Sequence, residues 1–221
     1  MSIICVANTK GGTSKSTLTT CLGALLANWG KRVALLDADP QATTKGWLDR
    51  RNKFQPDAAK VQAFCVEGDV YNPARDLAKV YDEVLVDTAG SSNGELTTAL
   101  LAAQVVLIPF RPSVPDLDAM TTVNKLLRDA RNMRVALDKG PRALAVVSLA
   151  STNPRVTEVE EAKQYMAKFP EIELLPVFVR DRKEYRDSML AGLGVTESSN
   201  QLAKAEIEAL AAILYPNELD S

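Results

Sequence analysis

Two lysines, two glycines and several hydroxyl residues lie together near the start of the chain, in the sequence Lys10-Gly11-Gly12-Thr13-Ser14-Lys15-Ser16-Thr17. The apolar residues 3–6 before it predict a strand, and apolar residues at helical spacing from Leu18 onward predict a helix after it. A Gly-rich turn between a strand and a helix presents free backbone N–H groups and the positive end of the helix dipole to an anion. Lys15 adds a full positive charge, and the Ser16 hydroxyl can ligate a hard cation such as Mg²⁺. The stretch therefore predicts a site for nucleotide phosphates and their metal ion.

Two further apolar runs end in acidic residues. Residues 32–36 lead to Asp37-Ala38-Asp39-Pro40-Gln41, and residues 81–86 lead to Asp87 and then Thr88-Ala89-Gly90. In an α/β sheet the carboxyl ends of the strands form the edge where ligands bind. Carboxylates there can hold a metal ion and position a water molecule, which are the main requirements of phosphoryl transfer. Taken alone, the first run fits equally well a polar strand end before a proline turn.

The loop differs from the usual phosphate-binding pattern, G-x-x-x-x-G-K-[ST], because Thr9 and Ser14 stand where glycines are expected. It fits K-G-G-x-x-K-[ST], in which Lys10 lies five residues before Lys15. Here the chain resembles the ParA/MinD family of deviant Walker-type ATPases, some of which also have serine before the second lysine. The D-x-D-P-Q stretch and the strand that ends at Asp87 resemble that family's next two motifs, in the same order. The resemblance covers most of the chain.

The resemblance implies a role for each matching residue. The family's signature lysine, here Lys10, reaches across an ATP-bound homodimer to the phosphates held by the other subunit. Asp39 would orient the attacking water, which makes Lys10, Lys15 and Asp39 the catalytic candidates. The implied ligands of Mg²⁺ or of its water shell are Ser16, Asp37 and Asp87, and residues 88–90 would sense the γ-phosphate. The implied nucleotide-binding residues are Lys10, Gly11, Gly12, Thr13, Ser14, Lys15, Ser16, Thr17, Arg180 and Asp181.

A charged segment, Arg180-Asp181-Arg182-Lys183-Glu184-Tyr185-Arg186-Asp187, follows the last predicted strand. By resemblance its first two residues lie near the adenine, while Arg182, Lys183 and Arg186 contribute to sequence-independent binding of double-stranded DNA. A surface helix whose charges pair with one another explains the same segment equally well. The formal net charge of the chain is −2. Any DNA binding must therefore come from a local basic patch.

Composition excludes several other kinds of site. The chain contains no histidine, which removes Ser-His-Asp and Cys-His catalysis and any histidine-ligated metal centre. Its three cysteines are far apart, which fits free thiols in a reducing cytoplasm. We expect no membrane binding, because there is no long apolar run and Lys204 is the only basic residue after Arg186, unlike the basic C-terminal helix of MinD. The expected location is the cytoplasm, in association with the nucleoid.

Predicted strands and helices alternate about seven times, which is typical of a mostly parallel twisted sheet with helices on both faces. With the resemblance, this predicts one P-loop NTPase domain over residues 1–221, without the N-terminal DNA-binding domain of larger ParA proteins. Asn72 is predicted to cap a helix that has Pro73 at its first position, and Trp47 to be a packing residue. The proline-rich residues 109–116 predict a rigid connector, or, by resemblance, a loop near the nucleotide and the dimer face. The remaining helices are expected over residues 43–50, 94–103, 116–133, 158–169 and 201–214, and the remaining strands over 61–66, 105–109, 142–148 and 174–179.

The leading functional hypothesis is a partition or cargo-positioning ATPase that uses ATP and Mg²⁺. Its ATP-bound dimer would bind DNA, and hydrolysis stimulated by a ParB-like or centromere-binding adaptor would release it. One alternative is a metabolic ATP-dependent enzyme of the same superfamily, similar to dethiobiotin synthetase. Another is a nucleotide-dependent scaffold with negligible hydrolysis, against which Asp39 argues. The sequence names neither the cargo nor the adaptor.

Overall fold

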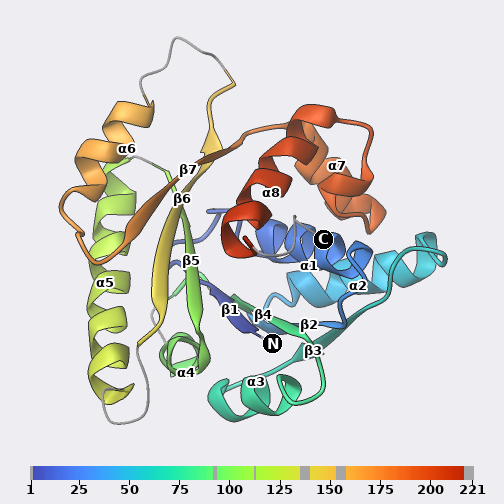
Figure 1. Ribbon diagram of the computed structural model, residues 1–221, viewed down its shortest axis with the longest axis horizontal. Helices are drawn as coiled ribbons and strands as arrows, with labels where there is room; N and C mark the ends of the chain where they lie inside the picture. Colours follow the sequence, from blue (N-terminus) through green and yellow to red (C-terminus); the bar gives the residue numbers. More distant parts are fainter. Residues whose placement is uncertain (1, 92–93, 112, 135–139, 153–157, 217–221) are drawn as a thin grey trace.

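Seven parallel strands form one sheet in the order β3-β2-β4-β1-β5-β6-β7 (Figure 1). The computed structural model describes residues 2–91, 94–111, 113–134, 140–152 and 158–216. The strands are β1 Ser2–Val6, β2 Val33–Ala38, β3 Val61–Cys65, β4 Glu83–Thr88, β5 Val105–Phe110, β6 Arg142–Ala150 and β7 Glu173–Arg180. The helices of these residues are α1 Lys15–Asn28, α2 Thr43–Phe54, α3 Tyr71–Leu77, α4 Gly94–Ala102, α5 Val114–Arg134, α6 Glu158–Met166, α7 Lys183–Ala191 and α8 Gln201–Leu214, with a 3₁₀ turn at Val195–Glu197. The predicted single α/β domain is confirmed, and its described strand pairs are all parallel.

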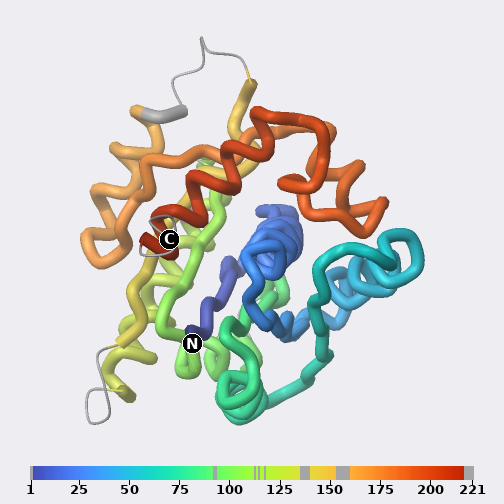
Figure 2. Tube along the Cα trace, turned by 45° about the vertical axis from the view of Figure 1, so that its right-hand side comes forward, coloured from blue at the N-terminus to red at the C-terminus, as the bar shows by residue number. Residues whose placement is uncertain are grey.

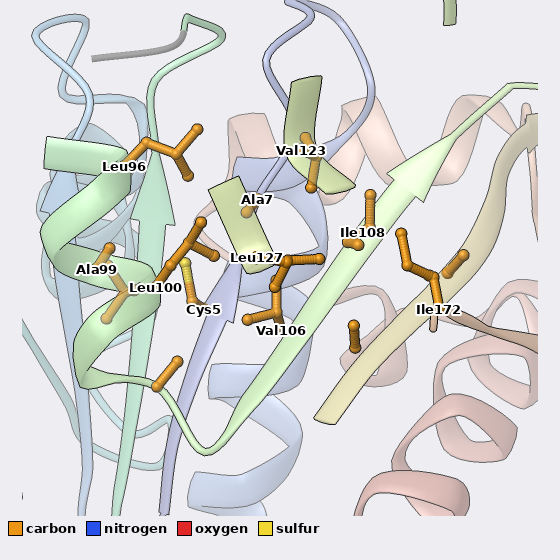
Figure 3. Close-up of a cluster of buried hydrophobic side chains, with 14 of the residues drawn as sticks. Cys5, Ala7, Leu96, Ala99, Leu100, Val106, Ile108, Val123, Leu127 and Ile172 are labelled. Carbon is orange, nitrogen blue, oxygen red and sulfur yellow. The ribbon is translucent and has the colours of Figure 1, made fainter. Parts of the chain in front are cut away.

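Helices cover both faces of the sheet because the strands are apolar on both sides. Within β1, Ile3 and Cys5 belong to a cluster with α3, α4, α5 and α6, whereas Ile4 and Val6 belong to a cluster with α1, α2, α7 and α8. Figure 3 shows the first cluster, in which side chains of α4 and α5 gather around Cys5 and Val106. Continuous apolar strands are expected where a parallel sheet is buried on both faces. The two clusters hold the central strands, and hence the loops that follow them, in fixed positions.

The strand register brings the predicted motifs together. β1 lies between β4 and β5, and Val6 pairs with Asp87. Asp37 of β2 pairs with the same Asp87 of β4. The Gly-rich loop therefore leaves the middle of the sheet beside both carboxylates, at the edge where α/β proteins bind ligands.

Several predicted boundaries shift by a few residues. The prediction that Asn72 caps α3 is wrong: α3 begins at Tyr71, and the Asp69 carboxylate accepts hydrogen bonds from the Tyr71 N–H and the Asn72 side chain. α5 begins at Val114, two residues early, because Pro115 fits the first turn of a helix. α6 ends at Met166, before the predicted residue 169. Pro112, within the proline-rich stretch, lies outside the described residues.

The opposite edge of the sheet holds both ends of the described chain. The Tyr215 hydroxyl donates to Glu83 Oε2 at 2.9 Å, and the Ser2 hydroxyl donates to the same carboxylate oxygen. Trp29 packs edge-on against the Tyr215 ring. Glu83 thus ties the end of α8 to the first residues of β1 and β4 (Figure 1). No helix among the described residues has the length and apolar character needed to cross a lipid bilayer.

Candidate nucleotide-binding site

The Gly-rich loop between β1 and α1 is held in place by side chains of the loop itself and of β6. Asn8 Nδ2 donates to the Pro109 carbonyl at 2.7 Å, and Asn8 Oδ1 accepts from the Lys10 N–H at 2.9 Å. Ser148 Oγ, on β6, donates to the Thr13 carbonyl at 3.1 Å. Asn8 and Ser148 are fully buried, so these bonds fix the loop against the sheet. These hydrogen bonds therefore hold the Gly-rich loop in one conformation before any ligand binds.

The backbone conformation of Ser14 shows why the usual phosphate-loop pattern has a glycine at this position. Its backbone is left-handed, with φ of 69°, directly before the first residue of α1. Only glycine adopts this conformation without steric cost, and other residues lose about 1 kcal/mol or more. Here serine accepts that strain at the position where the helix N-terminus opens toward the cavity.

The loop encloses a cavity of about 350 Å³ at the start of α1. Besides Gly11 to Thr17, the cavity is lined by Asp39, Gln41, Thr43 and Gly90. Lys15 is buried, and burial lowers the pKa of its ammonium while Asp87 and Asp39 act in the opposite direction. Its Nζ donates to the Lys10 carbonyl at 3.0 Å. A buried cation beside a Gly-rich loop and a helix N-terminus is suited to a polyphosphate.

Two carboxylates lie beneath this cavity. Asp37 Oδ2 accepts from the Lys45 N–H at 2.9 Å, and burial raises the pKa of Asp37. Asp87 is fully buried, and burial raises its pKa to about 7 against the lowering effect of hydrogen bonds from Ser16 and Thr44. Thr44 Oγ1 donates to Asp87 Oδ2 at 2.7 Å, while Asp87 Oδ1 has no hydrogen-bond partner among the described residues.

These residues fit a bound Mg²⁺. An orphaned buried carboxylate oxygen is costly unless a further group satisfies it. Mg²⁺ prefers oxygen ligands and keeps several waters, so one or two carboxylates, a hydroxyl and substrate phosphates suffice to hold it. Ser16, Asp37 and Asp87 supply that donor set, with Asp87 Oδ1 as the free oxygen.

Lys10 does not line the cavity of its own chain. Its Nζ forms an ion pair of 2.6 Å with Asp116 Oδ2, at the start of α5. Asp116 is fully buried and also accepts hydrogen bonds from Ser113 Oγ and the Arg111 N–H. The proline-rich stretch thus carries the carboxylate that holds Lys10. The resemblance to other ParA proteins gave the general location of this stretch, but the sequence did not reveal the role of Asp116.

The loop after β4 touches the phosphate loop directly. A Cβ on Gly90 would lie 2.8 Å from the Gly11 Cα and N atoms, closer than side chains approach. Thr88 Oγ1 donates to the Val6 carbonyl at 3.0 Å. Residues 88–90 are therefore placed to respond to the loop that surrounds the phosphates.

Arg180 and Asp181, the residues predicted to lie near the adenine, are close to the end of the Gly-rich loop. They line a smaller cavity of about 60 Å³ together with Ser14, Thr17 and Tyr185. The Arg180 N–H donates to Glu206 Oε2 at 3.1 Å, and its guanidinium donates to the Ser151 carbonyl. The structure thus brings Arg180 and Asp181 to the phosphate loop, next to Ser14 and Thr17.

The three basic residues predicted to bind DNA differ in exposure. Arg182 is only 17% exposed and forms an ion pair of 2.8 Å with Glu206. Lys183 is 79% exposed and pairs with Asp187 at 3.0 Å, whereas Arg186 is 65% exposed and pairs with Asp181 at 2.8 Å. Lys183 and Arg186 can therefore reach a phosphate backbone at the surface, while Arg182 fastens α7 to α8.

Three of the basic residues of α5, Arg128, Arg131 and Arg134, are bonded to other parts of the chain. Arg134 is buried and donates to the Ala103 carbonyl at 2.5 Å. Arg128 and Arg131 both pair with Glu171. Among Lys125, Arg128, Arg131 and Arg134, only Lys125 is an exposed cation for which the described residues offer no ion pair.

Sequence reasoning missed Asn8, Thr44, Asp116 and Ser148, which position the loop, Asp87 and Lys10. A buried polar residue carries no periodic signal. The one available signal was the hydroxyl of Thr44, which follows the D-x-D-P-Q stretch at the start of a helix.

A parallel α/β sheet, a phosphate loop before a helix and acids on two neighbouring strands define a P-loop-type nucleotide-binding protein. Residues 4–195 match the family model described as the CobQ/CobB/MinD/ParA nucleotide binding domain. The chain belongs to this family.

Relatives and solved structures agree with this membership. The chain is 32% identical over 196 residues to the maintenance of carboxysome distribution protein A of Halothiobacillus neapolitanus, covering 87% of this chain and 85% of that protein. It is 29% identical over 170 residues to the chromosome-partitioning ATPase Soj of Thermus thermophilus, covering 65% of this chain and 67% of the relative. The fold matches apo McdA from Cyanothece with a TM-score of 0.80 at 15% identity, over 97% of this chain and 99% of that one.

Proposed function

We propose that this chain is a cargo-positioning ATPase that binds ATP with Mg²⁺ and acts as one domain over residues 1–221. The observation that carries this proposal is the phosphate cavity, which joins a buried Lys15, the orphaned oxygen of Asp87 and a preorganised loop. Relatives of similar length support it, since they are named for carboxysome distribution and chromosome partitioning. A structure of McdA carrying the D38A substitution holds ATP, and a structure of MinD from Pyrococcus horikoshii holds Mg-ADP; both share this fold.

Hydrolysis needs a positioned water and neutralised phosphate charge. Asp39 lines the cavity, and its Oδ1 is oriented by the Gln41 N–H at 2.9 Å. We assign Asp39 to orienting the attacking water and Lys15 to neutralising the phosphates. Bound Mg²⁺ would supply further charge neutralisation through Ser16, Asp37 and Asp87. Gly11, Gly12, Thr13, Ser14 and Thr17 would surround the phosphates.

Lys10 acts on the partner subunit in this proposal. Its ammonium is paired with Asp116, and Lys10 is not among the residues that line the cavity of its own chain. An ATP-bound homodimer places each Lys10 against the phosphates of the other subunit. Dimerisation requires Lys10 to leave Asp116.

The dimer would bind double-stranded DNA without sequence preference and so associate with the nucleoid. Lys183 and Arg186 are the most exposed cations of the segment, and Arg182 holds their helix in place. Two weak patches on one particle gain affinity through effective concentration. A ParB-like adaptor on the cargo would stimulate hydrolysis and release the dimer.

Binding to random-sequence duplex DNA tests this proposal, measured without nucleotide, with ADP and Mg²⁺, and with ATP and Mg²⁺. We expect binding only with ATP, falling with added salt. The binding should be lost in Lys10→Ala and retained in Asp39→Ala. ATP turnover that needs a small-molecule substrate, with no DNA binding in any state, would instead favour the metabolic alternative.

A further inference from the structure

The first turn of α2 is attached to the carboxylates of the metal site. Ala42, at the N-cap position, is left-handed with φ of 48° and offers no capping side chain. Asp37 takes that role by accepting from the Lys45 N–H at 2.9 Å, and Thr44 Oγ1 donates to Asp87 at 2.7 Å. The backbone N–H groups at a helix start need such partners. The start of α2 therefore depends on both carboxylates.

The other half of α2 is attached to the end of α7. Trp47 Nε1 donates to the Leu193 carbonyl at 3.0 Å, and Arg50 Nε donates to the Met189 carbonyl at 3.0 Å. Two more donors complete the set: Arg51 Nη1 to Gly192 O at 3.1 Å and Gln55 Nε2 to Ala191 O at 3.2 Å. The last carbonyls of a helix have no partners within the helix. Side chains from α2 and Gln55 reach two such carbonyls of α7, those of Met189 and Ala191, and the carbonyls of Gly192 and Leu193 directly after it.

The contact between α2 and the end of α7 is too close for any side chain. Gly192 has a left-handed φ of 71°, and a Cβ there would lie 2.4 Å from the Arg51 N atom. Figures 1 and 2 both show α7 lying beside α2. Because the backbones of Arg51 and Gly192 are in direct contact, a movement of α2 at this point should also move the end of α7.

We propose that α2 couples the metal and phosphate site to α7, so that the nucleotide state sets the position of α7. A metal ion with its water shell would draw on the same two carboxylates, Asp87 and Asp37, that hold Thr44 and Lys45. A change in those bonds shifts the first turn of a helix of 12 residues, which is about 18 Å long at 1.5 Å per residue. The four bonds at its other half carry the shift to α7. The consequence for Lys183 and Arg186 rests on the proposed function, but the coupling itself does not.

Hydrogen exchange of the α7 amides tests the coupling. It is measured without nucleotide, with ADP and Mg²⁺, and with a slowly hydrolysed ATP analogue and Mg²⁺, each at saturation. All chains carry Lys10→Ala, and sedimentation establishes that they are monomers. We expect exchange over Lys183–Ala191 to change about fivefold on Mg²⁺-nucleotide binding, a typical size for coupling between sites. Thr44→Val and Arg50→Met should each reduce this difference to less than about twofold.

Lys53→Met is the matched control for Arg50→Met. Lys53 lies on the same helix, carries the same charge and contacts the Phe54 ring, so its loss should leave the difference unchanged. Gln55→Ala removes one of the four bonds at the exposed end of α2 and provides a milder second variant. Exchange that is equal in all nucleotide states, or a difference that survives in folded Arg50→Met and Thr44→Val, would overturn the proposal.

DNA binding of the same variants without Lys10→Ala separates this inference from the proposed function. A nucleotide-dependent α7 in a chain that binds no DNA supports the coupling and contradicts the DNA-binding role. ATP-dependent DNA binding with an α7 indifferent to nucleotide overturns the coupling and leaves the proposed function standing.

Discussion

The phosphate cavity and the segment that begins α7 are both rich in charge, but their charges are satisfied differently. In the cavity, Lys15 is buried with a backbone carbonyl as partner, and Asp87 Oδ1 has no partner among the described residues. In the α7 segment, Arg182, Lys183 and Arg186 each pair with a carboxylate of their own chain. Uncompensated buried charge is unfavourable for the folded protein. The cavity is therefore built for a ligand, whereas any ligand of the α7 segment must compete with existing ion pairs.

Among the substitutions that test this comparison, Lys15→Ala should have the largest effect on ATP turnover. Loss of the buried ammonium removes the charge that neutralises the phosphates, so ATP turnover should fall about 100-fold or more. The unfolding free energy should stay near that of the wild type, because a buried ammonium is itself costly to the fold. Steady-state phosphate release and thermal unfolding measure the two effects. Unchanged turnover in the folded variant would contradict the assigned role.

Asp87→Asn should separate function from stability. The pKa of Asp87 is about 7 in the folded chain against a usual 3.8, so the folded state binds more protons between these values. The wild type therefore loses stability relative to Asp87→Asn as pH rises from about 4 to about 7, by up to about 1.4 kcal/mol per pH unit. Denaturant unfolding across this range measures the difference. Mg²⁺-dependent ATP binding should weaken strongly in the variant, and a pH-independent difference would argue against an uncompensated Asp87.

Asp116→Asn tests a buried carboxylate near the cavity that already has an ion-pair partner, Lys10. Removing the negative charge weakens the hold on Lys10, so ATP-dependent dimers should form at about tenfold lower protein concentration. Sedimentation velocity in an Asp39→Ala background measures this without turnover. Asp118→Asn, on the exposed side of the same helix, is the control. Weaker dimerisation in Asp116→Asn would mean that Asp116 positions Lys10 for the partner.

Single substitutions in the α7 segment should divide into two kinds. Lys183→Ala and Arg186→Ala should each weaken DNA binding severalfold and reduce the slope of its salt dependence by about one. Arg182→Ala should lower the unfolding free energy by about 1–3 kcal/mol, because the largely buried Glu206 carboxylate loses its ion-pair partner and keeps only uncharged hydrogen-bond donors. Salt titration of DNA binding and thermal unfolding distinguish them. A salt slope in Lys183→Ala and Arg186→Ala equal to that of the wild type would show that these exposed residues do not contact phosphate.

Ser14→Gly is the smallest expected change. Glycine adopts φ of 69° without strain, but it gains entropy in the unfolded chain, so the net effect on stability should be within about 1 kcal/mol. Nucleotide affinity should stay close to the wild type, because the backbone N–H remains in place. Titration with a fluorescent ATP analogue measures it. A large loss would mean that the hydroxyl itself contacts the nucleotide.

The sequence was sufficient for the fold and for the centre of the cavity. Apolar runs ending at Val6, Asp37 and Asp87 predicted parallel strands, and the register places these residues side by side. Residues Gly11 to Thr17 line one cavity, and their role in binding a nucleotide stays a prediction. Local patterns fix such features because each motif directly follows its own strand.

Contacts between distant segments could not be predicted in this way. Lys10 meets Asp116 across 106 positions, and Arg50 meets Met189 across 139. Neither pairing follows from spacing or from helix periodicity, because both depend on how the helices pack over the sheet. The sequence of the α7 segment indicates internal ion pairs as one of two alternatives. It does not show that, of Arg182, Lys183 and Arg186, only Arg182 would be largely buried.

Glu83 has a practical consequence for following this protein in cells. Because Ser2 and Tyr215 both bond to it, the two ends of the described chain lie together at the start of β1 and β4, at the edge of the sheet opposite the Gly-rich loop. A fluorescent reporter fused at either end would be attached through Ser2 or Tyr215, at the strand ends opposite those that carry the Gly-rich loop. Movement of a tagged protein should therefore report the untagged cycle, and moving the tag from one end to the other should leave that movement unchanged.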